Sequence, residues 1–322
     1  MKKIISVILS LALLVCSFTA CGNGKSSSGD DTFDIVVTIF PEYDWVLNIL
    51  GDNPGNAQVT LLLDNGVDLH SYQPTASDIL KISTCDLFVY IGGESDEWVD
   101  DALKEAVNRD MEVLDLISPL GDMAKDEEHI EGMEENEEEE EGEAEYDEHI
   151  WLSLKNAAVL CEKIASAIAV KDPANEAVYK ANLDAYIHSL EELDKRYEDT
   201  VSSSNFDTLV FADRFPFRYM VDDYGLSYYA AFAGCSAETE ASFETVMFLS
   251  AKVDELSLRS VMVIEGGNTR IAETVIGNTK DKDQKILTLD SMQGTGASGI
   301  KEGKTYLSIM EKNLEVLAEA LR

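Results

Sequence analysis

The sequence YDEHIWLS, residues 146–153, separates a strongly acidic run from a helical pattern. Before it lies a long acidic run, whose like charges and few apolar side chains predict disorder. After it, apolar residues recur every three or four positions, which predicts a helix with one buried face. These residues are Leu154, Ala158, Cys161, Ile164, Ala165 and Ile168. His149 therefore stands where a loop meets a rigid element, and most histidines in such a place are solvated surface residues.

Composition limits the classes of partner. The chain has 322 residues and a hydrophobic content of 45%, which is enough for two domains. Its 62 acidic and 25 basic residues give a formal net charge of -37. Nucleic acid and anionic membrane surfaces would repel such a chain, whereas cations would be attracted to it. Only fifteen of the acidic residues lie between Asp126 and Glu148, so the acidity extends over the whole chain.

The first thirty-two residues predict export and anchoring. Lys2 and Lys3 precede an apolar run, residues 4–15, that is too short for a mature membrane span and typical of a secretory signal peptide, here residues 1–20. The residues around Cys21 resemble the lipobox of bacterial lipoproteins, so we expect Cys21 to carry the lipid. The polar residues that follow, up to residue 32, suit a flexible tether. We therefore expect a protein anchored to the cell membrane by lipid, outside the cytoplasm, at the cell surface or in the periplasm.

The remaining cysteines do not indicate a disulfide framework. Cys85, Cys161 and Cys235 are odd in number and widely spaced. Cys161 falls on the apolar face of the predicted helix, which indicates a place in the core.

Strand patterns alternate with helical patterns on both sides of residues 146–153. The predicted strands are residues 33–39, 58–63, 87–91 and 111–116 in the first half, and 208–211, 260–264 and 285–289 in the second. Such alternation predicts mostly parallel sheets with helices on both faces. Each half opens with a strand, a Phe-Pro pair and a helix ended by glycine, at Phe40-Pro41 and Phe215-Pro216, which suggests one plan used twice.

We therefore predict an α/β protein of two lobes, each a mostly parallel sheet flanked by helices, linked by a long helical strut. The N-terminal lobe spans residues 33–124 and the C-terminal lobe residues 200–322. Between them lie an acidic disordered insertion, residues 125–148, and the strut, residues 149–199, which Asp172-Pro173 interrupts. The insertion is either a solvated loop or a collector of divalent cations beside the cleft.

Polar residues that follow strands are the candidates for a binding site, because ligands of open α/β sheets sit beyond the carboxyl ends of the strands. His70, Arg214, Glu265 and Asp290 hold such positions, and His149 precedes the strut. Taken singly, each has a structural explanation: a loop histidine, an ion-paired arginine or a helix-capping acid. No spacing such as His-x-x-x-His marks any of them as a metal ligand.

Two segments change this assessment. DLHSYQPT, residues 68–75, resembles the Asp-Pro-His-x-Tyr-Glu-Pro-Thr segment of the zinc and manganese solute-binding proteins of ABC transporters, and DEHIWL, residues 147–152, resembles their Asp-Pro-His-x-Trp-Leu segment. The resemblance extends over the whole mature chain. It implies a divalent cation held between two α/β lobes by two histidines, a third ligand that is His or Glu, and a final carboxylate. His70, His149 and Asp290 match three of these positions.

Arg214 falls on the third position, counted back from Tyr224-Gly225. A guanidinium has no lone pair to donate, so Arg214 cannot bind a metal. We expect it to be turned away, paired with an acid, or a sign of a changed ligand. Asp213 and Glu265 are the favoured substitute ligands or ion-pair partners, ahead of two other acids, Glu238 and Glu240.

The resemblance implies a lipoprotein, expected to be a monomer, that captures a divalent metal and delivers it to an ABC permease. Two imidazoles with carboxylates favour Zn2+, although Mn2+ would suit a more oxygen-rich set. One alternative is a binding protein that uses Arg214 for an anion or a metal chelate. Another is a surface adhesin with a structural metal. We expect no enzyme, because no general base stands at a recognisable spacing.

Overall fold

The computed structural model describes residues 33–134, 146–236 and 240–322. The predicted signal peptide, the lipidation site at Cys21 and the tether lie outside the described residues, as does the centre of the acidic run. Within the described residues, no helix combines the length and the apolar composition that crossing a membrane requires.

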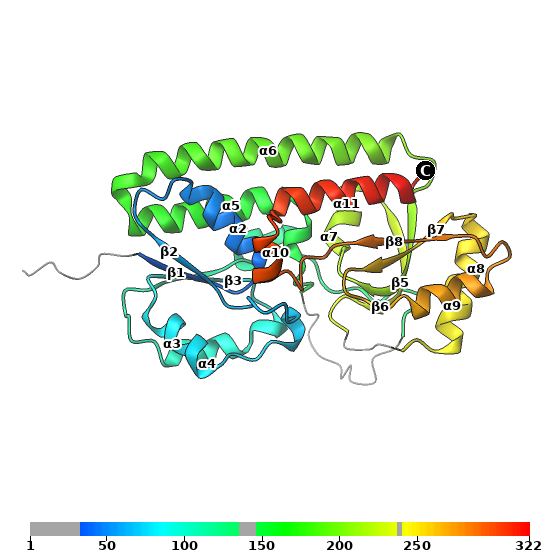
Figure 1. The fold of residues 1–322 in the computed structure, drawn as a ribbon, viewed down its shortest axis with the longest axis horizontal. Helices are drawn as coiled ribbons and strands as arrows, with labels where there is room; N and C mark the ends of the chain where they lie inside the picture. Colours follow the sequence, from blue (N-terminus) through cyan, green and yellow to red (C-terminus); the bar gives the residue numbers. More distant parts are fainter. Residues whose placement is uncertain (1–32, 135–145, 237–239) are drawn as a thin grey trace, which may run out of the picture. The chain divides into compact units, whose positions relative to one another are not determined.

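The first lobe is built on a parallel sheet of four strands. The strands are β1 (Asp34–Val37), β2 (Gln58–Leu61), β3 (Leu87–Tyr90) and β4 (Glu112–Asp115). Their order is β2-β1-β3-β4, and every neighbouring pair is parallel. Apart from Asp34 at the start of β1, the central strands β1 and β3 consist of apolar and aromatic residues, because helices cover both faces of the sheet. In Figure 1, α2 (Phe40–Leu50) lies on one side of this sheet, and α3 (Ala76–Thr84) and α4 (Trp98–Lys104) lie on the other.

The second lobe repeats this plan. Its strands are β5 (Thr208–Phe215), β6 (Ser227–Ala233), β7 (Ser260–Ile264) and β8 (Lys285–Leu289). The order β6-β5-β7-β8 is the order of the first sheet, and again all pairs are parallel. Its helices are α7 (Arg218–Tyr224), α8 (Phe243–Leu256), α9 (Arg270–Asn278), α10 (Ala297–Lys301) and α11 (Tyr306–Ala320). The predicted pair of parallel sheets is confirmed.

Strand β6 is absent from the sequence-based prediction. Its sequence, SYYAAFA, combines three aromatic residues, which favour strands, with three alanines and no β-branched residue, so its strand signal is mixed. Packing decides the outcome, because β6 pairs with β5 along most of its length. This omission matters for the site, since the loop after β6 carries one of its side chains.

The predicted strut is a helical hairpin. Helix α5 (Leu154–Lys171) runs back from the centre of the molecule, the chain reverses at η5 (Pro173–Asn175), and α6 (Glu176–Ser202) returns alongside α5 (Figure 1). Helix α6 alone has 27 residues, a length of about 40 Å at 1.5 Å per residue. It contacts α2 in the first lobe and α7 and α11 in the second. A long helix does connect the lobes, as predicted, but α5 and α6 do not lie end to end.

A shared core holds the two lobes together. The rings of Trp45 in α2 and Tyr306 in α11 meet edge to face with their centroids 5.3 Å apart. The Tyr306 hydroxyl donates to the backbone oxygen of Trp151 (2.7 Å), and the Tyr197 hydroxyl of α6 donates to the backbone oxygen of Met310 (2.6 Å). All five of these residues are buried in one hydrophobic cluster that contains residues of both lobes. Moving the lobes apart would expose this apolar surface to water. The free energy that such exposure costs stabilises the closed arrangement.

The described ends of the acidic run are ordered, which corrects the predicted boundaries of the insertion. Asp126 and Tyr146 form an antiparallel bridge. The backbone N–H of Lys125 donates to the Tyr219 hydroxyl (3.0 Å), and that of Glu134 donates to the backbone oxygen of Ala231 (2.9 Å). The sequence pattern suggested disorder from residue 125 to 148, but residues 125–134 and 146–148 belong to the folded body. Hydrogen bonds to the second lobe order these residues, although their polar composition favours disorder.

An ion pair joins the lobes beside the candidate site. Arg214, in β5, places Nη2 2.7 Å from Oδ2 of Asp68, in the first lobe. The predicted partners of Arg214, Asp213 and Glu265, are not the ones observed. The other oxygen of Asp68 accepts the backbone N–H of His70 (3.1 Å). Asp68 thus fixes one of the site histidines and connects it to the opposite lobe.

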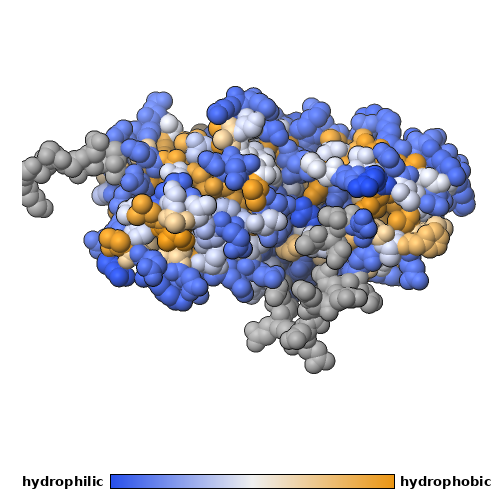
Figure 2. Space-filling model, turned by 60° about the horizontal axis from the view of Figure 1, so that its bottom comes forward, coloured by the Kyte–Doolittle hydropathy of each residue, from blue (hydrophilic) through white to orange (hydrophobic). Residues whose placement is uncertain are grey.

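The outer surface is mainly polar. Figure 2 shows hydrophilic residues over much of one face, with hydrophobic residues in smaller groups between them. Among the described large hydrophobic side chains, Phe243 and Val107 are the most exposed. Single exposed apolar residues of this kind are normal for a folded protein.

The buried acid Glu42 links the start of α2 to the preceding strand. Its Oε2 accepts the backbone N–H groups of Thr38 (2.7 Å) and Ile39 (3.1 Å) and the Thr38 hydroxyl (3.0 Å). Burial raises the pKa of Glu42 from 4.5 to about 8, and the nearby Asp96 adds to this effect. Between these two pH values the native state keeps a proton that the unfolded state has released.

Glu42→Gln should reduce the pH dependence of stability. The contribution of the Glu42 proton is fully present below the unfolded pKa and is lost as the pH rises towards the folded pKa. Glutamine does not titrate, so the free energy of unfolding in urea should fall less for the variant than for the wild type between about pH 5 and about pH 8. Glu191→Gln, at an exposed site on α6, should keep the wild-type slope. Identical slopes for wild type and Glu42→Gln would contradict this role of Glu42.

Arg214→Gln should lower the free energy of unfolding by about 1 kcal/mol, because the pair with Asp68 is largely shielded from water. The two side chains are 21% and 27% exposed. The matched control is Arg196→Gln, which breaks a pair with Glu311 whose side chains are 54% and 53% exposed, and should change stability by less than about 0.5 kcal/mol. Urea titrations of single and double variants with Asp68→Asn measure the coupling energy. A coupling no larger than that of Arg196 with Glu311 would refute the interlobe role.

Candidate metal centre

His149 is completely buried and held by its own segment. It is the N-cap of the short helix η4 (Ile150–Leu152). Oδ1 of Asp147 lies 2.8 Å from the backbone nitrogen and 2.9 Å from Nδ1 of His149. A carboxylate accepts hydrogen bonds, so Nδ1 carries a proton and Nε2 of the neutral ring keeps its lone pair. The sequence pattern alone favoured a solvated histidine, and burial excludes that interpretation.

His70 is positioned from the first lobe in the same manner. It lies in η1 (Leu69–Ser71), whose N-cap is Asp68. Its Nδ1 lies 2.8 Å from the Ser95 hydroxyl and 3.5 Å from Oε2 of Glu148. The other oxygen of Glu148 accepts the backbone N–H of Ser95 (2.6 Å), which holds the three residues together. With Nδ1 directed at these oxygens, Nε2 of His70 also keeps a free lone pair.

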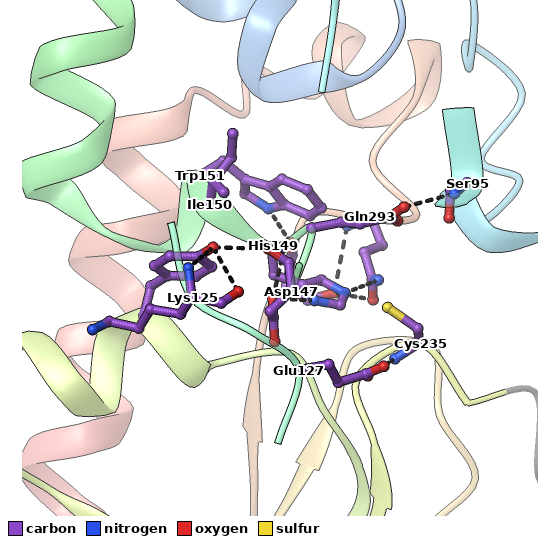
Figure 3. Close-up of polar contacts among 12 residues, drawn as sticks. Ser95, Lys125, Glu127, Asp147, His149, Ile150, Trp151, Cys235 and Gln293 are labelled. Carbon is purple, nitrogen blue, oxygen red and sulfur yellow. Dashed lines mark hydrogen bonds and ion pairs between the residues drawn. The ribbon is translucent and has the colours of Figure 1, made fainter. Parts of the chain in front are cut away.

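The two Nε2 atoms face each other across 3.2 Å, although their residues are 79 positions apart in the chain. Between them reaches the side chain of Gln293, whose amide nitrogen is 2.8 Å from each Nε2. The amide can donate one N–H to each ring. Figure 3 shows the side chain of Gln293 reaching the His149 ring. Two lone pairs aimed at one point form a site for a positive charge.

Electrostatics disfavours two positive charges on this pair. Burial, with a smaller contribution from repulsion by His149, lowers the pKa of His70 to about 3. Burial also disfavours a charged His149, but the carboxylates of Asp147 and Glu148 outweigh it and raise the pKa of His149. The rings therefore do not both hold an extra proton near neutral pH, and at least one Nε2 is open to a metal ion.

Cys235 completes the cluster. The ligand atoms of His70, His149 and Cys235 all lie within 4.8 Å of one another. Cys235 follows β6 in the loop that begins with Gly234, and its backbone N–H donates to Oε1 of Glu127 (3.1 Å). In Figure 3 its sulfur points towards the amide of Gln293 and the ring of His149.

The other predicted site residues are placed elsewhere. Asp290 lies outside the group of His70, His149 and Cys235. Its Oδ2 is 3.2 Å from Nζ of Lys304, and its Oδ1 accepts the backbone N–H of Met292 (2.9 Å). The structure thus brings together two of the three predicted ligands, and it adds Cys235 and Gln293.

The acids proposed to replace the missing ligand have structural partners. Asp213 accepts the backbone N–H groups of Arg214 (2.9 Å) and Ile264 (3.2 Å). Glu265 accepts the backbone N–H (2.6 Å) and the hydroxyl (2.7 Å) of Ser291. Burial raises the pKa of Glu265 to about 7, and the neighbouring Asp290 adds to the shift. Both acids therefore shape the loops that follow β7 and β8. Of the other two candidates, Glu238 lies outside the described residues, and Glu240 is exposed.

Two signals could have revealed the missed residues. Cys235 occupies the loop beyond the carboxyl end of a strand, the position that identified the other candidates, but its strand β6 was not recognised. Gln293 lies three residues after Asp290 in the loop that follows β8. That loop is fixed from η4, because the indole nitrogen of Trp151 donates to the backbone oxygen of Ser291 (2.8 Å).

Known proteins resemble this chain over nearly its whole length. AdcA of Streptococcus pneumoniae strain R6, named a zinc-binding lipoprotein, is 31% identical over 324 residues, a match that spans 99% of this chain and 61% of AdcA. The high-affinity zinc uptake system protein ZnuA of Bacillus subtilis is 29% identical, over 98% of this chain and 96% of the relative. The chain therefore corresponds to well under two thirds of the AdcA length.

A solved structure agrees with the fold. The crystal structure of the Zn(II)-bound ZnuA-like domain of Streptococcus pneumoniae AdcA superposes with a TM-score of 0.70 at 26% sequence identity, and the match covers 90% of this chain and 99% of that domain. The family model described as zinc-uptake complex component A, periplasmic, matches residues 35–320. Because this match includes both sheets, the connecting helix and both histidines, the chain belongs to the ZnuA family of periplasmic zinc-uptake components.

Proposed function

We propose that this protein captures Zn2+ outside the cytoplasm and delivers it to an ABC permease. The observation that carries the proposal is the 3.2 Å separation of the Nε2 atoms of His70 and His149. Nitrogen ligands about 2.0–2.1 Å from a tetrahedral zinc ion stand roughly 3.3–3.4 Å apart, so the two rings are already spaced to share one ion. The zinc-binding relatives and the family support the same cargo.

Both imidazoles are prepared for binding by neighbouring acids. A histidine that donates its second N–H to a carboxylate has a fixed ring orientation and a more basic ligand nitrogen. Asp147 has this position behind His149, and Glu148 lies behind His70 together with Ser95. Gln293 is the residue that must move, because its amide nitrogen stands where an ion shared by the rings would sit.

Zinc is favoured over manganese by the chemistry of the donors. Imidazole nitrogen suits zinc, whereas manganese prefers a set made mostly of oxygens. Asp290 was the predicted carboxylate ligand, and its oxygens are engaged by Lys304 and Met292. Binding through Asp290 would require that ion pair to open, so we propose Asp290 as an organiser of the Gln293 loop in the resting protein.

The contacts between the lobes limit how the ion can be released to a permease. The shared core and the Asp68–Arg214 pair oppose a wide opening of the lobes. We therefore propose that local movement of the ligand loops, rather than a hinge motion, frees the ion. A lipid on Cys21 would hold the protein at the membrane beside its permease, as for relatives named lipoproteins.

The alternative functions receive less support. Recognition of an anion through Arg214 conflicts with its ion pair to Asp68, which already balances the charge of the guanidinium. We propose a binding protein and no catalytic activity, because the acids beside the two rings position them and none is left as a separate general base.

Replacing both His70 and His149 with alanine should abolish high-affinity zinc binding in isothermal titration calorimetry, because both convergent lone pairs are lost. The control is His188→Ala, which removes a histidine that is 70% exposed on α6. This control should bind zinc like the wild type. Unchanged zinc affinity in the double variant would show that the metal site lies elsewhere.

Asp147→Asn should weaken zinc binding by about 10- to 100-fold, the usual cost of losing a carboxylate behind a metal-bound histidine. The amide can still accept the Nδ1 proton, so the ring stays in place while the charge is lost. Asp184→Asn, at an exposed site on α6, should leave the affinity unchanged. Competition with a chromophoric chelator measures the constants, and equal affinities for the two variants would contradict the proposed role.

A further inference from the structure

We propose that Cys235 is a third ligand of the metal held by His70 and His149, and that it binds as a thiolate. This inference rests on the proposed function and names its donor set: two imidazole nitrogens and one sulfur. Such a set selects borderline and soft dications, Zn2+ above all, and disfavours Mn2+, because thiolate ligands match the softer metals. The sequence analysis did not select Cys235, because the strand that precedes it was not recognised.

The geometry needs only a small adjustment. The three ligand atoms already lie within 4.8 Å of one another. In a tetrahedral zinc site with bonds of about 2.3 Å to sulfur and about 2.0–2.1 Å to nitrogen, sulfur and nitrogen stand roughly 3.5–3.6 Å apart. Closing this difference takes a shift on the order of 1 Å, which a rotation of the Cys235 side chain and a small loop movement can supply.

The backbone before Cys235 is shaped for close approach to His149. A Cβ atom at Gly234 would lie 2.8 Å from Cε1 and 3.1 Å from Nδ1 of the His149 ring, so a residue with a side chain would push the loop away. The hydrogen bond from the Cys235 N–H to Glu127 holds the next residue in place. Two independent contacts thus aim the thiol at the pair of imidazoles.

The remaining cysteines of the described chain behave differently. Cys85 and Cys161 are buried within the hydrophobic core, and both are free thiols. The Cys85 thiol, at the C-cap of α3, donates to the backbone oxygen of Ile82 in that helix. Cys235 is the described cysteine that reaches the histidines, and only this one belongs to a metal-ligating cluster among the residues that the structure describes.

Binding would change the protonation of the sulfur. Burial and the neighbouring acids, Glu127 first among them, raise the pKa of Cys235 well above its usual range, so the resting side chain is a neutral thiol. When the ion binds, the S–H bond breaks, a metal–sulfur bond forms and the proton passes to the solvent. No oxidant or reductant takes part. The bound thiolate also offsets one of the two charges of the ion.

Cobalt(II) is the probe that tests this ligand, because a cobalt–thiolate bond gives a charge-transfer band in the near ultraviolet that nitrogen and oxygen ligands do not give. We expect the band in the wild-type chain and in the control Cys85→Ser, and its absence in Cys235→Ser. Loss of a carboxylate behind a ligand costs about 10- to 100-fold in affinity, so loss of the sulfur should weaken zinc binding by at least about 100-fold. Manganese binding should change far less.

A second measurement uses the wild-type chain alone and does not depend on the folding of a variant. Iodoacetamide alkylation, followed by mass spectrometry of peptides, reports the reactivity of each cysteine. Saturating zinc should strongly slow alkylation of Cys235 and leave the rate at Cys85 unchanged. An equal rate at Cys235 with and without zinc would overturn the proposal.

The outcomes separate this inference from the proposed function. If cobalt and zinc bind, the charge-transfer band is missing and Cys235→Ser keeps the wild-type affinity, then Cys235 is not a ligand and the two-histidine site stands. If the wild-type chain binds neither metal, both proposals fail. If the band and the affinity depend on Cys235 but not on Cys85, the sulfur ligand is established.

Discussion

Two imidazoles aimed at one point are the constraint on which the site depends. The Nε2 atoms of His70 and His149 are 3.2 Å apart, and each ring is held from behind by oxygen atoms that accept its other proton. Neutral rings in this arrangement present two lone pairs to the same small volume. Such a volume favours a cation, and in the resting protein the two N–H groups of the Gln293 amide take its place.

The rest of the fold keeps this convergence in place. One histidine comes from the first lobe and the other from the segment that leads into α5, so their spacing depends on how the first lobe packs against that segment. The aromatic core around Trp45 and Tyr306, helix α6 and the Asp68–Arg214 pair all oppose such movement. Rigidity of this kind suits selective capture, because the ligand spacing is set before the ion arrives. Under the proposed function, the ion is then released by movement of the loops that carry the ligands.

Arg214 stands where the family resemblance predicts a metal ligand, but it forms an ion pair instead. Its guanidinium cannot bind a metal, and in this protein it joins the lobes by pairing with Asp68, which also fixes the backbone of His70. The site is thereby left without a donor from β5. The loop of the adjacent strand β6 brings the sulfur of Cys235 close to both rings instead. Under the proposal that Cys235 binds the ion, a sulfur donor beside β6 serves in place of a donor from β5.

Two parallel sheets, a long connecting helix and the two site histidines can all be predicted from the sequence alone. Alternating apolar periodicities and short motifs around single residues are local signals, which a linear chain displays directly. Other features become visible only in the three-dimensional structure. Asp290 pairs with Lys304, Arg214 pairs with Asp68, and α5 and α6 form a hairpin. Cys235 and Gln293 lie beside the two histidines. These outcomes depend on which loops meet across the lobes. Strand β6 shows the reason: three alanines dilute the strand preference of its aromatic residues, and its pairing with β5 is a tertiary contact that no local pattern contains.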